Sequence, residues 1–135
     1  MTVRPMTPAD EPAVRALQSR LSYADPELVT AVLEGPFLGR VAVDDAVVGY
    51  AIALPAAETV VSELVVAPDH RRAGHGRRLL ESVADAADAE GLVVTTPTGN
   101  DAAISFYAAA GFEREARIEG FYADGGAALR LVRRG

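Results

Sequence analysis

The sequence contains no cysteine and no lysine, and it has only two histidines. Without cysteine, neither a disulfide bond nor a thiolate-bound metal can form, which agrees with a reducing cytoplasm. The two histidines, His70 and His75, lie in one loop and have no partners at the spacing of a metal site. We therefore expect no metal site.

Long hydrophobic runs are absent as well. The longest near-apolar stretch, residues 46–57, is too short to cross a bilayer. The opening residues M-T-V-R-P-M-T-P-A-D lack the apolar segment of a secretory signal. These absences predict a soluble, cytoplasmic protein.

All thirteen basic side chains are arginine, and the formal net charge is -6. An acidic chain binds nucleic acid poorly, because that binding depends on cationic side chains that neutralise phosphates. The lack of lysine is typical of a GC-rich genome and, with the acidic excess, also of a salt-rich cytoplasm. The length of 135 residues predicts one domain over residues 1–135 with a sizeable core.

The most informative stretch runs from Ser62 to Leu80 and reads S-E-L-V-V-A-P-D-H-R-R-A-G-H-G-R-R-L-L. A strand over residues 60–66 ends before a proline, which cannot donate to a β-ladder. A turn with Gly74 and Gly76 follows, and both glycines let a ligand approach the backbone closely. An apolar helix begins next, so the free N–H groups of the turn and the helix start form an anion site. Four arginines around this site indicate a phosphate-bearing ligand: Arg71, Arg72, Arg77 and Arg78.

Hydrophobic periodicity and turn residues predict the element order βααβββαβαββ. We expect strands at residues 2–5, 38–43, 47–54, 60–66, 92–96, 112–118 and 127–132, and helices at residues 11–21, 25–34, 77–90 and 101–110. The fourth helix should be capped by Asn100 or Asp101, and Gly91 and Gly111 should each follow a helix as the C′ residue.

These elements predict an α/β (α+β) fold with a mixed central sheet of about seven strands and helices on both faces. The three strands between residues 38 and 66 should form an antiparallel meander. The strands before and after the third helix should be parallel, because a helix connects them. The last two strands should form an antiparallel pair.

The segment R-x-x-G-x-G, which begins at Arg71, resembles the acyl-CoA-binding motif of the GNAT superfamily of N-acetyltransferases. The R-P-M-T-P-A-D opening and the N-x-x-A-x-x-F-Y-x-x-x-G-F segment from Asn100 to Phe112 extend this resemblance over the whole chain. A Rossmann fingerprint is excluded because Leu79 occupies the place of its third glycine, and the P-loop pattern is absent. The resemblance implies a single GNAT-like domain with acetyl-CoA as cosubstrate and no metal.

In that superfamily the N–H groups of the loop hold the CoA pyrophosphate. The resemblance assigns this role to Arg71, Arg72, Ala73, Gly74, His75, Gly76 and Arg77. It also implies that the pantetheine arm pairs like an extra strand with the backbone of Leu64, Val65 and Val66. The Val66 N–H would then polarise the thioester carbonyl. Asn100 resembles the family's side-chain contact to pantetheine, and its alternative role is that of a helix cap.

Acetyl transfer needs a neutral amine, so some group must accept a proton. Glu63 resembles the carboxylate that many superfamily members use, often through a water. In the alternative interpretation, Glu63 lies on a solvated strand face, which alternation makes it share with Val61 and Val65. The family's second base position corresponds to Thr95 or Thr96, which have no carboxylate.

Tyr107 resembles the tyrosine that reprotonates the departing CoA thiolate, and a phenol can donate a proton there. The alternative is a core aromatic, because the neighbouring residues Ile104, Phe106 and Ala108 indicate a largely buried helix. His75 is expected to act through its backbone and not as a base.

The last third of the chain partly resembles the ribosomal-protein alanine N-acetyltransferase branch, with Tyr122 in the tyrosine-bearing loop before the last strand. The sequence thus predicts transfer of an acetyl group from acetyl-CoA to a primary amine, on a protein N-terminus or a small molecule, by direct attack on the thioester. The alternatives are a non-catalytic acyl-CoA-binding sensor or partner domain, and a nucleic-acid-binding module. The presence of both Glu63 and Tyr107 favours the enzyme, which should be a monomer or homodimer without nucleic-acid or membrane partners.

Overall fold

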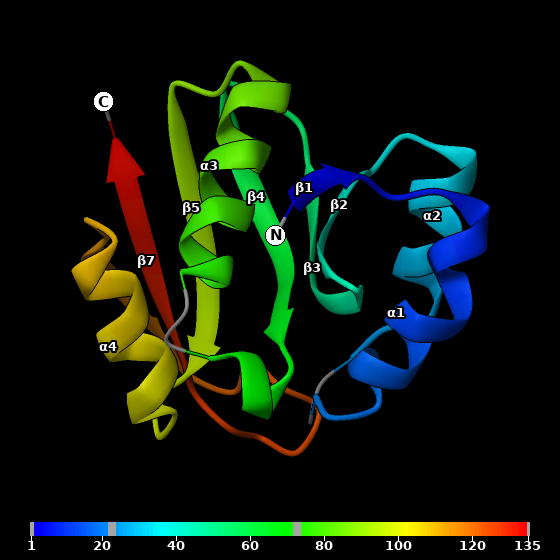
Figure 1. Ribbon diagram of the computed structural model, residues 1–135. Helices are drawn as coiled ribbons and strands as arrows, with labels where there is room; N and C mark the ends of the chain where they lie inside the picture. Colours follow the sequence, from blue (N-terminus) through cyan, green and yellow to red (C-terminus); the bar gives the residue numbers. More distant parts are fainter. Residues whose placement is uncertain (1, 22–23, 72–73, 135) are drawn as a thin grey trace.

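The computed structural model describes residues 2–21, 24–71 and 74–134 (Figure 1). Within these residues, seven strands form one sheet in the order β1-β2-β3-β4-β5-β7-β6. The strands are β1 (Thr2–Pro5), β2 (Leu38–Asp44), β3 (Ala46–Leu54), β4 (Glu58–Val66), β5 (Gly91–Pro97), β6 (Glu113–Ile118) and β7 (Ala128–Arg134). The helices are α1 (Glu11–Gln18), α2 (Glu27–Glu34), α3 (His75–Ala87) and α4 (Asp101–Ala109), with the short 3-10 turns η1 (Pro8–Asp10) and η2 (Pro68–His70). The predicted element order and mixed sheet are confirmed.

Strands β1 to β4 form the first half of the sheet and are antiparallel throughout. Asp45 lies between β2 and β3 with a φ of 64°. Aspartate adopts this left-handed conformation more readily than most side chains, so the sequence allows a very tight connection here. The predicted meander is confirmed.

Strands β5, β7 and β6 form the second half and are also antiparallel to one another. The two halves meet where β4 runs parallel to β5, after the crossover through α3. Residues 58–60 of β4 pair with residues 91–93 of β5. Beyond them, within the described residues, β4 pairs with β3 alone. The predicted parallel pair is confirmed, and the two strands separate toward their C-terminal ends.

Helices cover both faces of the sheet, and each face has its own core. On one face, Leu79 and Leu80 of α3 and Tyr107 of α4 belong to the same buried cluster. On the other face, Val14 of α1 and Val29 of α2 pack with residues of β2, β3 and β4. Figure 1 shows α3 and α4 together beside β4, β5 and β7, and α1 and α2 together near β2 and β3. In the described part of the chain, no helix is long and apolar enough to cross a membrane.

Two helix ends differ from the prediction. Helix α1 ends at Gln18, before the predicted end. Helix α3 ends at Ala87, followed by Asp88 in a left-handed conformation with a φ of 49°. Gly91 is therefore not a C′ residue but the first residue of β5. A Cβ atom at Gly91 would lie 3.0 Å from the Arg133 carbonyl oxygen on β7, so a side chain there would crowd the β7 backbone.

The ends of α4 agree with the prediction. The Asn100 Oδ1 accepts a hydrogen bond from the Ala103 N–H at 3.2 Å, which satisfies a donor of the first helical turn. Gly111 follows the last turn with a φ of 95°, and the Phe112 N–H donates to the Tyr107 carbonyl oxygen at 3.0 Å. Both the cap at Asn100 and the C′ glycine at Gly111 are confirmed.

Candidate active site

A cleft of about 880 Å³ opens where β4 and β5 separate. Its walls are formed by the end of β4, the turn before α3, the start of α4 and the two residues Arg20 and Leu21. The lining includes these predicted donor-site residues: Leu64, Val65, Val66, Arg71, Gly74, His75, Gly76 and Asn100. Arg77 is not part of the lining, and its guanidinium donates to the Ala109 carbonyl oxygen at 3.3 Å. Arg72 and Ala73 lie outside the described residues.

The two glycines at the start of α3 have different surroundings. Gly74 has a φ of 83°, and a Cβ atom there would meet no atom within 4 Å, so the backbone conformation is what requires glycine. A Cβ atom at Gly76, the second residue of α3, would lie 3.0 Å from Cζ of Phe106, so a side chain there would crowd the Phe106 ring of α4. The turn leads into the N-terminus of α3, whose first N–H groups have no acceptor within the helix and are suited to bind an anion.

The N–H of Val66 points into the gap between β4 and β5. Backbone groups along a strand alternate between its two edges. The Ala67 N–H donates to the Val48 carbonyl oxygen on β3 at 2.8 Å, so the preceding N–H lies on the opposite edge. The Val66 carbonyl on this open edge accepts a hydrogen bond from Arg71 Nε at 3.2 Å. The geometry thus leaves the Val66 N–H directed toward the cleft, where a ligand carbonyl can reach it.

Asn100 lines the cleft with the same side chain that caps α4. The cap uses the Oδ1 atom, whereas the Nδ2 atom makes no hydrogen bond with the described residues. The two interpretations of Asn100 are therefore compatible, because its N–H groups stay available to a ligand.

A bulge in β4 determines where Glu63 points. Glu63 and Val61 pair with consecutive residues of β3, so Ser62 has no partner on that strand. Val61 consequently joins the core under α3, whereas Val65 joins the core under α1 and α2. Glu63 faces the same side as Val65, since its hydrogen-bond partners include Gln18 of α1. The prediction that Glu63 and Val61 share a face is wrong, because the bulge interrupts the alternation.

The Glu63 carboxylate lies in a buried network of hydrogen bonds and is only 6% exposed. It accepts hydrogen bonds from Gln18 Nε2 at 3.0 Å, from the Tyr50 hydroxyl at 2.9 Å and from the Asp25 N–H at 3.2 Å. Burial and the negative charge of Glu63 raise the pKa of Tyr50 well above its ordinary value, so the phenol stays a donor. The interpretation of Glu63 as a carboxylate on a solvated face is therefore wrong. Glu63 is also not among the residues that line the cleft.

Tyr107 of α4 lines the cleft and is 9% exposed. Its ring packs edge-on against Phe106 and Phe112, with centroid distances of 5.2 Å in both cases. Burial raises the pKa of the phenol above its ordinary value, so Tyr107 keeps its proton at neutral pH. No described group forms a hydrogen bond with the hydroxyl. Tyr107 is thus a core aromatic that also borders the cleft, and its role as an acid stays a prediction.

The other residues considered from the sequence lie away from the cleft lining. Thr95 and Thr96 are on β5, and Thr96 is buried. Tyr122 lies in the connection between β6 and β7, where its N–H donates to the Gly126 carbonyl oxygen at 3.1 Å and its ring packs against Phe121. The geometry does not bring Tyr122 to the predicted donor site.

The sequence interpretation missed the three donors around Glu63. Gln18 follows Val14 by one helical turn on the buried face of α1, so an amide within an apolar stripe was the available signal. Tyr50 places a hydroxyl inside a buried central strand, and such a group normally has a partner. Asp25 contributes through its backbone, which no side-chain pattern can indicate.

A mixed sheet whose parallel strands separate beside a glycine turn and a helix N-terminus defines a fold suited to bind an acyl-CoA. The model of the acetyltransferase (GNAT) family matches residues 7–112. The chain therefore belongs to the GNAT acetyltransferase family, a family of acyltransferases that use acetyl-CoA as the donor for N-acetylation.

Solved structures share this fold over almost the whole chain. The ribosomal-protein-S18-alanine N-acetyltransferase from Escherichia coli has a TM-score of 0.82 at 24% identity, covering 98% of this chain and 92% of that chain. NAA60 from Arabidopsis thaliana in complex with acetyl-CoA has a TM-score of 0.85 at 19% identity, covering 98% and 97%. At 24% and 19% sequence identity, these similarities show that the fold is shared and nothing more.

In sequence, the chain is similar to an uncharacterised protein of Mycobacterium leprae (strain TN). The two are 36% identical over 95 residues, which are 67% of this chain and 26% of that relative. The chain thus spans about a quarter of the length of this curated relative.

Proposed function

We propose that this chain transfers an acetyl group from acetyl-CoA to a primary amine by direct attack on the thioester. The observation that carries the proposal is the composition of the cleft. At one end the Gly74 turn and the N-terminus of α3 are suited to the CoA pyrophosphate. At the other end, the Val66 N–H and the Tyr107 phenol are suited to the two atoms that gain negative charge during transfer.

In the proposed reaction, the neutral amine nitrogen attacks the carbonyl carbon of the thioester. The carbonyl oxygen gains negative charge, which the Val66 N–H stabilises. The C–S bond then breaks, and Tyr107 donates its proton to the departing thiolate. The proton released by the amine passes through water to Glu63, and the Tyr107 phenolate regains a proton from solvent. The products are an N-acetylated amine and CoA.

The first acceptor to test is a protein N-terminus, and the second is a small-molecule amine. The E. coli structure of the same fold is named for an alanine of ribosomal protein S18, a protein acceptor, which supports the first class. A panel of peptides with different N-terminal residues, aminoglycosides and polyamines, assayed by release of the CoA thiol, separates the two. A cytoplasmic location, a single domain over residues 1–135 and a monomeric or homodimeric state stay predictions from the sequence.

The donor site is tested by replacing Gly74 with valine. A β-branched residue at a φ of 83° is strained and would disturb the turn, so we expect acetyl-CoA affinity to fall at least about tenfold in calorimetry. Gly125→Val is a matched control, because Gly125 has a φ of 87° and also has no atom within 4 Å of its Cβ position, but does not line the cleft. Unchanged affinity in a folded Gly74→Val protein would place the donor elsewhere.

The acid is tested with Tyr107→Phe, which keeps the packing against Phe106 and Phe112 and removes the hydroxyl. We expect turnover to fall by about 10²-fold or more, with melting temperature and acetyl-CoA affinity retained. Normal turnover in this variant would leave Tyr107 as a core aromatic only.

A non-catalytic acyl-CoA-binding domain is the second candidate, and one observation favours it. Glu63 accepts hydrogen bonds from three donors and does not line the cleft. Both features are expected of a carboxylate with a purely structural role. Under this alternative, acetyl-CoA binds with an affinity that Gly74→Val lowers, yet no amine in the panel produces free thiol.

A further inference from the structure

Three potential metal ligands from distant parts of the chain lie together beside the donor turn. They are Asp44, the last residue of β2, His70, the last residue of η2, and His75, the first residue of α3. One carboxylate oxygen and one ring nitrogen from each histidine lie within 4.8 Å of one another, and no other such group occurs in the described part of the chain. The sequence showed two histidines without spaced partners, and the fold supplies the third ligand.

The buried state of His75 points independently to a missing partner. His75 is only 3% exposed, and its Nδ1 atom has no hydrogen-bond partner among the described residues. A polar nitrogen that loses water on folding without gaining a partner lowers stability. The His70 ring lies beside it, with a centroid distance of 6.1 Å. A cation held between the two rings would give the buried imidazole a strong interaction.

We propose that Asp44, His70 and His75 bind one divalent transition-metal ion of the Zn²⁺ type. Imidazole nitrogen and carboxylate oxygen are ligands that Zn²⁺ accepts, and three protein ligands leave a fourth position for water. Asp44 is exposed, so an ion can enter from solvent, while His75 closes the inner side. At bond lengths of about 2.0–2.1 Å, tetrahedral ligand atoms lie about 3.3 Å apart. The ligand atoms now lie within 4.8 Å of one another, so binding requires them to come closer by up to about 1.5 Å.

The site connects three segments around the donor turn. His70 and His75 stand on either side of the turn that contains Gly74, and both line the cleft. Asp44 belongs to the sheet, so a bound ion would fix both ends of the turn to the end of β2. The proposal concerns binding of the ion to the chain without CoA and does not depend on the acceptor.

The test uses the full chain without a polyhistidine tag, treated with EDTA, dialysed and kept free of CoA. Titration with Zn²⁺ in a calorimeter should give one ion per chain, and Co²⁺ should give the visible absorption of a four-coordinate site. Asp44→Asn and His70→Gln should each weaken Zn²⁺ binding at least about tenfold, because each removes a direct ligand. Asp45→Asn is the matched control, since it makes the same charge change at the next residue and tolerates its φ of 64°.

His75 is buried, so its replacement can affect folding, and the two variants at Asp44 and His70 carry the test. Binding that Asp44→Asn and His70→Gln weaken and Asp45→Asn leaves unchanged supports the site. Zn²⁺ binding weaker than about 100 µM in the unmodified chain, or equal loss in Asp44→Asn and Asp45→Asn, overturns it.

Discussion

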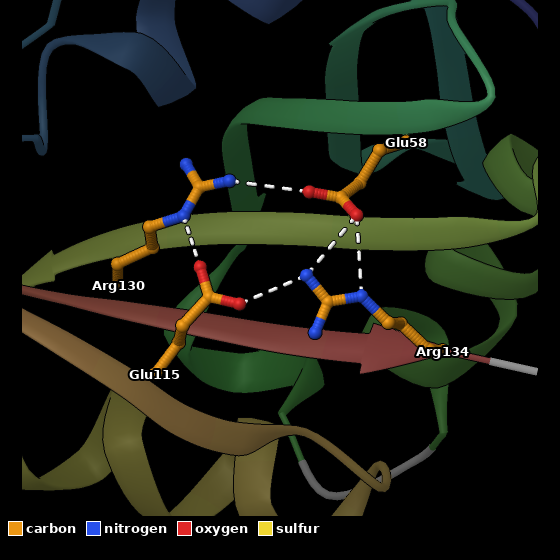
Figure 2. A network of polar contacts seen from close by, with 4 residues as sticks. All are labelled: Glu58, Glu115, Arg130 and Arg134. Atoms are coloured by element: carbon orange, nitrogen blue, oxygen red, sulfur yellow. Dashed lines mark hydrogen bonds and ion pairs between the residues drawn. The ribbon is translucent and has the colours of Figure 1, made fainter.

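Strand β4 carries two glutamates in opposite environments. Glu58, its first residue, is in contact with solvent and belongs to a closed set of ion pairs with Glu115, Arg130 and Arg134 (Figure 2). Both arginines lie 3.2 Å from Glu58, and they lie 2.7 and 2.8 Å from Glu115. Glu63 is buried and, within the described residues, accepts hydrogen bonds from uncharged donors alone.

The charge of Glu58 lies at the surface among arginines, whereas the charge of Glu63 is buried among uncharged donors. Exposed ion pairs are screened by salt, and each contributes little to stability. Arginine neighbours also weaken a carboxylate as a base, and Arg130 and Arg134 hold the pKa of Glu115 below its ordinary value. The donors around Glu63 offset part of the cost of burying its charge without adding a cation. Among the described residues, the Glu63 carboxylate therefore has hydrogen-bond donors but no arginine beside it.

The largest expected effect is on catalysis and separates the two glutamates directly. Glu63→Gln should lower kcat/KM by about 10²-fold or more and remove the acidic limb of the pH profile, because an amide cannot accept the amine proton. Glu58→Gln makes the same change on the same strand and should alter the rate by less than about twofold. If the rate and the acidic limb survive in Glu63→Gln, Glu63 is not the base.

Asp10 is an intermediate case, since it is buried like Glu63 but paired like Glu58. Its carboxylate meets the Arg4 guanidinium at 2.8 and 2.9 Å, and the pairing with Arg4 lowers its pKa from 3.8 to about 2. The stabilisation is therefore fully present above about pH 4 and is lost as the pH falls toward 2. Asp10→Asn should lower the free energy of unfolding at pH 7 by about 2 kcal/mol.

Urea denaturation between pH 2 and pH 7 measures this effect. The variant should show a flatter pH dependence than the unmodified chain below about pH 4. Glu11→Gln is the control, because the Glu11 side chain is 40% exposed and pairs with Arg15 one helical turn away, which contributes only tenths of a kcal/mol. Equal losses in Asp10→Asn and Glu11→Gln would show that burial of the Arg4 pair adds nothing.

The smallest effect concerns the surface network itself. Glu58→Gln should change the free energy of unfolding by less than about 1 kcal/mol at low salt, and the difference should vanish in 1 M NaCl. Thermal unfolding at both salt concentrations checks this. A larger, salt-independent loss would mean that the network of Figure 2 packs as a rigid unit over β5 and β7.

Much of the fold was predictable because it rests on local signals. The hairpin at Asp45, the glycine turn before α3 and the caps of α4 at Asn100 and Gly111 each depend on a few neighbouring residues. The parallel crossover follows from a helix between two apolar strands. These local signals also located the cleft, since most predicted donor-site residues line it.

The parts that were not predictable depend on contacts between distant segments. The unpaired Ser62 is visible only from the pairing of β4 with β3, and it reverses the side on which Glu63 lies. A side chain at Gly91 would crowd β7, which comes much later in the chain. Asp44 approaches His70 and His75 only once β2 and α3 are packed together.

Strands β4 and β5 pair over only three residues each, so the middle of the sheet contains an open line between them, here called the seam. Residues 58–60 pair with residues 91–93 at one end of this seam. Toward the other end, the described residues of β4 and β5 do not pair with each other. A pantetheine arm lying in this opening would act as a temporary strand that closes the seam. A donor that binds in this way binds only the folded chain and therefore stabilises it. At 100 times its Kd, the donor would add about 2.7 kcal/mol to the free energy of unfolding. Slower hydrogen exchange should follow along β4 and β5, the strands that border the seam.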